Sequence, residues 1–190
     1  MAAIQNFLAT SGFIPLFVLG LLSLYLILTL WVFFYKYICI KGSVLKEQQA
    51  LEAIMAGARK DLRLKGMSLQ GAPEKPTKEW LAMWKNQLLK ENTTGLVILS
   101  IIASTAPFVG LFGTVVEILE TFGHLGAGGQ VSFDVIAPVI SKALVATAGG
   151  ILTAIPAYSF FLILKRKVYD LSTYAQMQID FLMARENDGF

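Results

Sequence analysis

The sequence predicts an all-α membrane protein, with three transmembrane helices that continue into long cytoplasmic helical extensions and assemble into a homo-oligomer. Of its 190 residues, 55% are hydrophobic and only 15% are charged, whereas about a quarter of the residues of a typical soluble domain are charged. The charged residues are also unevenly placed, because they leave three long stretches almost without charge. Both observations indicate a protein that lies in a lipid bilayer.

Each of the three stretches is long enough to cross a bilayer, which takes about 20 residues in a helix. Residues 13–35 are 23 residues without a formal charge, and residues 92–116 are 25. Residues 135–164 are 30, interrupted only by Lys142. We therefore expect transmembrane helices at 13–35, 93–122 and 135–164. The first is predicted to be a permanent anchor, because no Lys or Arg precedes it and its apolar run is too long for a signal peptide.

The positions of lysine and arginine predict the orientation, because cytoplasmic loops are enriched in these residues. Residues 1–35 contain none and residues 36–90 contain 11. Residues 91–134 again contain none, and residues 165–185 contain four. The N-terminus is therefore expected outside the cytoplasm and the C-terminus in the cytoplasm, as in a multi-pass membrane protein.

The same distribution assigns the remaining segments to two compartments. Residues 1–12 are expected to form an outer interfacial segment, and residues 123–134 a periplasmic turn. Residues 36–92 are expected to form a cytoplasmic helical loop, and residues 165–190 a cytoplasmic helical tail. The formal net charge of +3 is small and lies on the cytoplasmic side, so it is interpreted as a topology signal, and no binding of nucleic acid is expected.

Helical spacing of apolar residues predicts that the polar segments extend the membrane helices and pack on each other. One helix is expected over Val44–Leu64, a break at Gly66–Pro76, and a second helix from Thr77. A further helix is expected over residues 168–186. The expected packing faces are Trp80, Leu81, Trp84 and Leu88 in the second of these helices, and Val168, Leu171, Tyr174, Ala175, Gln178, Ile179 and Leu182 in the last.

Residue types that carry enzymatic or metal chemistry are scarce. Cys39 is the only cysteine, and His124 is the only histidine and falls in the glycine-rich turn. This predicts no disulfide, no metal site and no cofactor. The sequence also contains no HExxH motif, no phosphate-binding loop and no nucleophile elbow, so an enzyme is not expected.

The second and third apolar stretches differ from the first in their content of small and hydroxyl-bearing residues. Small residues let helix backbones approach closely in lipid, and hydroxyls bond across helices or line a wet path. One three-helix chain offers too few contacts to use them all, which predicts an oligomer, whereas the first helix is expected to face lipid. Five residues are expected to set helix packing and bending: Pro107, Gly110, Gly113, Gly149 and Pro156.

Two ionisable residues, Glu117 and Lys142, fall inside the second and third stretches. They are about 9 and 12 Å from the outer ends of their helices, from a rise of about 1.5 Å per residue, so they can meet in an antiparallel hairpin. Intramembrane charges are costly and are functional candidates by default. The alternatives are a purely structural pair and a Lys142 side chain that extends outward to the interface.

Two runs in the hairpin have a specific pattern. Residues 106–115 are APFVGLFGTV, and residues 143–157 are ALVATAGGILTAIPA. These runs resemble the second- and third-helix signatures of the MotA/TolQ/ExbB proton channel family, closest to ExbB and TolQ. The resemblance is strong over residues 95–165 and covers the rest of the chain only by architecture.

The resemblance implies a homo-pentamer whose second and third helices surround a pore. It also implies a single-pass partner similar to ExbD or TolR, present as a dimer in the pore, and possible contact with a TonB- or TolA-like protein. In such complexes protons are carried by an aspartate of the partner that faces ring threonines, at the positions of Thr114 and Thr147. Glu117 and Lys142 depart from the pattern, because relatives usually have glycine and glutamate there. We interpret them as mutually compensating residues and include all four in the expected proton pathway.

The predicted function is that of an ExbB/TolQ-like subunit of an inner-membrane motor. Proton flow would drive a partner that acts on the cell envelope, in outer-membrane uptake, envelope maintenance or motility. A flagellar-type stator subunit is an alternative, although that group typically has four transmembrane helices and a larger cytoplasmic domain. A membrane scaffold without ion passage is the other alternative.

Overall fold

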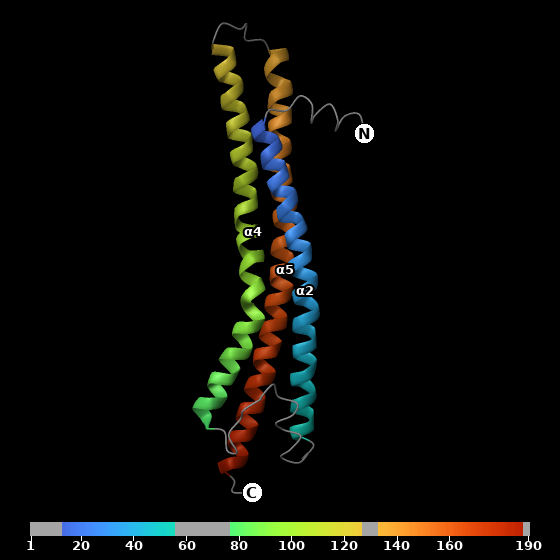
Figure 1. The fold of residues 1–190 in the computed structure, drawn as a ribbon, viewed down its shortest axis with the longest axis vertical. Coiled ribbons are helices and arrows are strands. Elements are labelled where there is room, and N and C mark those ends of the chain that lie inside the picture. The colour runs from blue at the N-terminus through green and yellow to red at the C-terminus, as the bar shows by residue number, and fades with distance from the viewer. Residues whose placement is uncertain (1–12, 56–76, 127–132, 188–190) are drawn as a thin grey trace. The chain divides into compact units, whose positions relative to one another are not determined.

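The computed structural model of the chain describes residues 13–55, 77–126 and 133–187, which form three long α-helices (Figure 1). Their 43, 49 and 55 residues are each more than twice the roughly 20 needed to cross a bilayer. Each helix contains a stretch that is long and apolar enough to do so. The predicted all-α class and the three apolar helices are confirmed. The helices are α2 (Phe13–Met55), α4 (Lys78–Gly126) and α5 (Phe133–Asn187).

The helices do not end where the predicted membrane segments end. α2 continues past Tyr35, and α4 and α5 run through residues 92 and 164 without interruption. A helix propagates readily once it is formed, and none of these three junctions contains a proline to interrupt it. The predicted helical extensions of the membrane helices are therefore direct continuations of them.

The helices on either side of the predicted turn at 123–134 extend into it at both ends. α4 continues to Gly126, so the backbone of His124 is helical, and α5 begins at Phe133. A single glycine costs a helix only about 1 kcal/mol and does not by itself end it, which is why Gly123 was a poor marker of the boundary. The interfacial segment and the Gly66–Pro76 break fall outside the residues that the structure describes.

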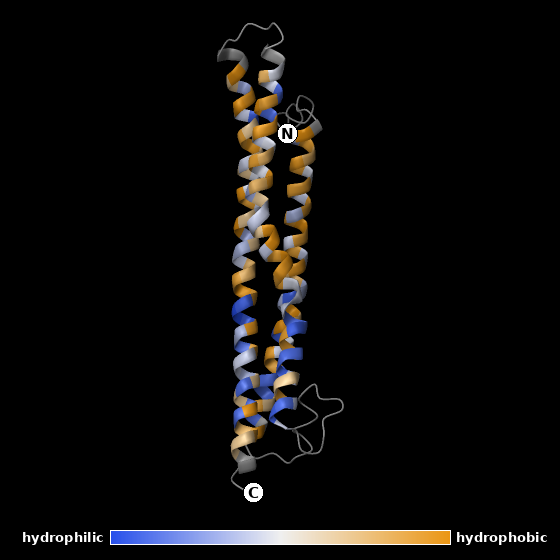
Figure 2. Ribbon diagram, turned by 90° about the vertical axis from the view of Figure 1, so that its left-hand side faces the viewer, coloured by the Kyte–Doolittle hydropathy of each residue, from blue (hydrophilic) through white to orange (hydrophobic). Residues whose placement is uncertain are grey.

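The chain divides into two compact units, and each helix contributes to both. Unit 1 consists of Met1–Val32 and Ile98–Phe160, and unit 2 of Phe33–Val97 and Phe161–Phe190. Helices of unit 1 are coloured mostly orange for hydrophobic residues, whereas most of the blue, hydrophilic segments belong to unit 2 (Figure 2). Each unit has a core of its own.

The core of unit 1 is built largely from small side chains. It consists of Val18 and Leu22 from α2, Ala106 from α4, and Ala146 and Ala154 from α5. Alanines let the helices approach closely, which is how helices associate in lipid. Many other apolar side chains of α2 in this unit are exposed, and the expectation that the first helix faces lipid stays a prediction.

The core of unit 2 is built from larger side chains. It confirms the packing faces that the helical spacing predicted in the polar segments, and Val44 of α2 packs against the same cluster. Larger apolar side chains suit a unit in which burial from water stabilises the fold. The buried residues of this cluster are Leu81, Trp84 and Leu88 from α4, and Leu171, Ala175 and Ile179 from α5.

α4 begins with a side-chain cap at Thr77, where the second polar helix was predicted to start. The Trp80 backbone N–H donates to Thr77 Oγ1 at 3.3 Å, and the Leu81 N–H donates to the Thr77 carbonyl oxygen at 3.0 Å. The cap satisfies a backbone donor that has no partner inside the helix.

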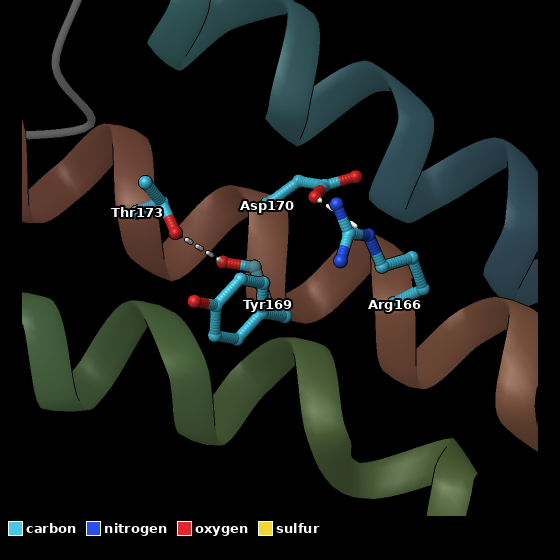
Figure 3. Close-up of polar contacts among 4 residues, drawn as sticks. All are labelled: Arg166, Tyr169, Asp170 and Thr173. Carbon is cyan, nitrogen blue, oxygen red and sulfur yellow. Dashed lines mark hydrogen bonds and ion pairs between the residues drawn. The ribbon is translucent and has the colours of Figure 1, made fainter.

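One exposed face of α5 in unit 2 carries local polar contacts (Figure 3). Arg166 Nε lies 3.2 Å from Asp170 Oδ1, and the Arg166 guanidinium carbon lies 5.5 Å from the centre of the Tyr169 ring. Thr173 Oγ1 donates to the Tyr169 carbonyl oxygen at 3.1 Å. Exposed i,i+4 ion pairs contribute only about 0.3–0.5 kcal/mol, so these contacts support the helix locally.

Lys36 links α2 to α4 within unit 2. A β-carbon added at Gly95 would lie 2.6 Å from Lys36 Cγ, so the lysine stem occupies the space that the glycine leaves. Lys36 Nζ donates to the Glu91 carbonyl oxygen at 3.1 Å. The sequence indicated Lys36 only as a positive charge, whereas the structure gives it a packing role.

Glu47 is a buried carboxyl group in unit 2, with only 2% of its surface exposed. The side-chain amide of Gln178 donates to its carbonyl oxygen at 2.9 Å and to its Oε2 at 3.0 Å. Burial raises the pKa of Glu47 above the ordinary value of 4.5, and the Gln178 hydrogen bond and the charge of Lys46 offset part of this rise. Glu47 therefore binds its proton more tightly in the folded chain than in the unfolded chain.

We predict that Glu47→Gln removes a component of the pH dependence of stability. Because the pKa of Glu47 is raised on folding, its stabilising contribution is complete below about pH 4.5 and is lost as pH rises through the raised value. One proton changes the free energy of unfolding by at most about 1.4 kcal/mol per pH unit. Thermal unfolding in detergent across this range measures the slope. Glu52→Gln, an exposed carboxyl on the same helix, is the control, and an equal change in both variants would contradict the assignment.

Candidate functional site

The backbones of α4 and α5 touch at two glycines. A β-carbon added at Gly110 would lie 2.6 Å from the carbonyl oxygen of Ala146 and 3.2 Å from the Gly150 Cα. A β-carbon added at Gly150 would lie 2.6 Å from the carbonyl oxygen of Ala106 and 3.2 Å from the Gly110 Cα. No other residue type fits at either position without moving a helix backbone. We call this contact the glycine crossing.

Two threonine hydroxyls meet beside the glycine crossing. Thr114 Oγ1 and Thr147 Oγ1 are hydrogen-bonded to each other. Thr114 Oγ1 also lies 3.2 Å from the carbonyl oxygens of both Gly110 and Ala143, and Thr147 Oγ1 lies 3.5 Å from the carbonyl oxygen of Gly110. The sequence identified both threonines, and the structure brings them into direct contact. We call them the threonine pair.

The threonine pair has two consistent arrangements of its two hydroxyl protons, because a hydroxyl both donates and accepts. In one, Thr147 donates to Thr114, which donates to a backbone carbonyl oxygen. In the other, Thr114 donates to Thr147, which donates to the carbonyl oxygen of Gly110. Exchange between them reverses the direction of the hydrogen bonds without placing a charge in the membrane. Such a pair can transfer or orient a proton.

Thr147 lies on the side of α5 that faces away from α2. A β-carbon at Gly113 would lie 3.0 Å from Val18 Cγ1, and one at Gly149 would lie 3.5 Å from Leu22 Cδ1, so both glycines face α2. Two residues span about 200° around a helix, which places Thr147 on the opposite side of α5 from Gly149. Thr114 is buried and Thr147 is half-buried, so Thr147 is the more accessible hydroxyl.

Glu117 and Lys142 lie along the same contact between α4 and α5. Glu117 is 8% exposed and follows Thr114 by three residues, which places it one turn away on a similar face. Its Oε2 is buried without a hydrogen-bond partner among the described residues. The charges that act on it belong to Lys142 of α5 and Glu120 of α4. Glu117 and Lys142 therefore lie on facing helices within range of each other's charge, and their action as a mutually compensating pair stays a prediction.

The structure places the residues that were expected to set helix packing and bending in different kinds of contact. Pro107 and Pro156 lie inside continuous helices, so neither ends its helix. Gly110 and Gly113 are at close contacts, whereas a β-carbon at Gly149 would make only ordinary contacts with α2. Gly149 therefore faces α2, and its neighbour Gly150 makes the crossing with α4.

The signal for Gly150 was present in the sequence. Ala143, Ala146, Gly150 and Ala157 recur at intervals of three, four and seven residues, which places them on one face of a helix. All four are buried. In the part of the chain that the structure describes, no group of three or more His, Cys, Asp or Glu side chains is arranged to hold a metal ion.

Comparison with known proteins places this site in a family. Residues 46–177 match the family model described as the MotA/TolQ/ExbB proton channel family. The chain belongs to the MotA/TolQ/ExbB family. This match covers the hairpin that carries the threonine pair and most of the described residues of unit 2.

Individual relatives of this family carry ExbB names. The chain is 56% identical over 186 residues to the "Putative biopolymer transport protein ExbB-like 1" of Helicobacter pylori J99, covering 97% of this chain and 98% of the relative. It is 42% identical over 80 residues to "Biopolymer transport protein ExbB" of Neisseria gonorrhoeae, covering 42% of this chain and 36% of the relative. The ExbB of Aquifex aeolicus is 46% identical over 84 residues, covering 44% and 57%. Family and helices together identify a multi-pass membrane protein of a proton-channel family.

We predict that Glu117→Gln and Lys142→Met each destabilise the chain and that the double variant recovers much of the loss. Removing either partner leaves the buried Glu117 or the half-buried Lys142 without its opposite charge, which costs on the order of 1–3 kcal/mol. Thermal unfolding of the four proteins in detergent measures the coupling as a double-mutant cycle. Lys165→Met, at an exposed lysine of α5, is the control. Losses that simply add would support the alternative in which Lys142 extends outward to the interface.

Proposed function

We propose that this chain is the ExbB/TolQ-like ring subunit of an inner-membrane motor in which proton flow drives a partner that acts on the cell envelope. The observation that carries the proposal is the threonine pair, two hydroxyls in contact inside a membrane-spanning hairpin. Hydroxyls can pass or orient protons while remaining neutral, so they avoid the cost of a permanent charge in lipid. Membership of a proton channel family gives this geometry its functional context.

The proposed proton path runs along the side of the hairpin opposite α2. Thr147 is the more accessible member of the threonine pair on this side. Thr114 is buried and orients the Thr147 hydroxyl through the hydrogen bond between them. Glu117 and Lys142 lie one turn nearer the end of the hairpin. Their opposite charges leave this part of the path close to neutral, so the carboxylate that takes up the proton is proposed to come from a partner.

That partner is proposed to be a single-pass, ExbD- or TolR-like membrane protein, present as a dimer in a pore formed by five copies of this chain. Support comes from the large apolar side chains that α4 and α5 leave exposed in unit 1, including Phe108, Leu111, Leu144 and Ile151. Such side chains face lipid, another subunit or a partner helix. A TonB- or TolA-like protein is proposed as the element that the motor drives.

The proposed orientation places the N-terminus in the periplasm and unit 2 in the cytoplasm. The distribution of lysine and arginine supports it, since 11 of the 16 lie in residues 36–90. The loop 36–92 and the tail 165–190 are then cytoplasmic extensions, and their described parts pack together in unit 2.

We predict that Thr147→Val lowers proton flux about tenfold, as expected when one hydrogen bond at the path is lost. The measurement uses the chain co-purified with its single-pass partner and reconstituted in liposomes that contain a pH-sensitive dye, under an imposed membrane potential. Thr147→Ser keeps the hydroxyl and is expected to conduct better than Thr147→Val.

Thr105→Val is the matched control for this experiment. The Thr105 hydroxyl lies in the same unit but bonds only to its own helix, at 2.8 Å from the Ile101 carbonyl oxygen. Equal flux in the wild type and Thr147→Val would contradict a proton path through the threonine pair. An absence of flux in every sample would favour the scaffold alternative.

A further inference from the structure

We infer that Gly150 of α5 is a positioning residue for the proton step. With Gly110 it brings the backbones of α4 and α5 close enough for the threonine pair to form. The inference rests on the proposed function, because it assigns Gly150 a role in proton passage. The close approach of the two helix backbones at Gly110 and Gly150 is observed whether or not the proposed function holds.

The first part of the evidence is the closeness of the glycine crossing. A β-carbon at Gly150 would lie 2.6 Å from the Ala106 carbonyl oxygen and 3.3 Å from the Gly110 backbone nitrogen. These atoms belong to a helix backbone, so no side-chain rotation can relieve the contact. Ordinary contacts of a β-carbon begin near 3.4 Å, whereas the β-carbon of an alanine at this position would lie 2.6 Å from the Ala106 carbonyl oxygen. Because protein interiors are closely packed, the two helices would have to separate locally by this difference, about 0.8 Å.

The second part is the sensitivity of the threonine pair to this separation. Thr147 precedes Gly150 by three residues and Thr114 follows Gly110 by four, so both hydroxyls lie about one turn from the crossing. Hydrogen bonds between hydroxyls span about 2.5–3.0 Å and weaken steeply beyond that range. The contact of Thr147 Oγ1 with the Gly110 carbonyl oxygen is already 3.5 Å. A separation of this size breaks the connection between the helices, while Thr114 can still bond to the Gly110 carbonyl oxygen of its own helix.

Gly149 provides a matched comparison at the adjacent position. Its added β-carbon would lie 3.5 Å from Leu22 Cδ1 and 3.7 Å from Leu19 Cδ2, which are ordinary contacts with flexible side chains. The change from glycine to alanine is chemically identical at the two positions. Only the change at residue 150 presses on the backbone of α4.

The test is a double-mutant cycle on proton flux in the reconstituted complex, normalised to the number of assembled complexes. Gly150→Ala and Thr147→Val are each expected to lower flux about tenfold, and the double variant is also expected to show about a tenfold loss. The losses do not multiply because both changes remove the same interaction. Gly149→Ala is expected to conduct like the wild type. The pH profile of flux is expected to shift in Gly150→Ala as it does in Thr147→Val.

Each other outcome overturns a specific statement. A loss of about a hundredfold in the double variant, or unchanged flux in Gly150→Ala, overturns the positioning role. If Gly150→Ala does not assemble, Gly110→Ala is tested from the other helix, and failure of both assigns the crossing to assembly alone and overturns the inference. Unchanged flux in Thr147→Val instead overturns the proposed function, so the two failures are distinguishable.

Discussion

The glycine crossing between Gly110 and Gly150 is the contact on which the geometry of unit 1 depends. In lipid there is no hydrophobic driving force between helices, so their association relies on close packing and on hydrogen bonds across the contact. The crossing supplies the closeness, because each glycine lies against backbone atoms of the other helix. Alanines at 106, 143 and 146 continue the contact as buried residues, and α2 packs against Ala106 and Ala146.

Burial of polar groups is handled differently in the two units. In unit 1 the threonine pair is satisfied by backbone carbonyl oxygens and by its own hydroxyls, which leaves it neutral. Glu117 Oε2 has no hydrogen-bond partner among the described residues, and the charge of Lys142 acts on this carboxyl group. In unit 2 the Glu47 carboxyl is held by the Gln178 amide. A buried polar group without such a partner is costly, so these contacts fix how the helices are aligned along their axes.

A neutral relay suits the proposed role of this chain as a ring subunit that works with a partner. The hydroxyls of Thr114 and Thr147 can reverse their hydrogen bonds without a change in charge, and the proposal leaves the ionisable group to the partner helix. In this proposal the chain holds the two threonine hydroxyls in place, and the partner provides the carboxylate that binds the proton.

The sequence alone determined the three apolar helices, the charge distribution and the two signatures of the proton channel family, because these are local properties of composition and spacing. It also identified Thr114, Thr147, Glu117 and Lys142. Only the tertiary structure decided that the two hydroxyls touch, that Gly150 rather than Gly149 makes the crossing, and that Glu47 is buried. The physical reason is that helical periodicity defines a face, whereas the rotation of each helix toward its neighbours is set by packing between residues far apart in the chain.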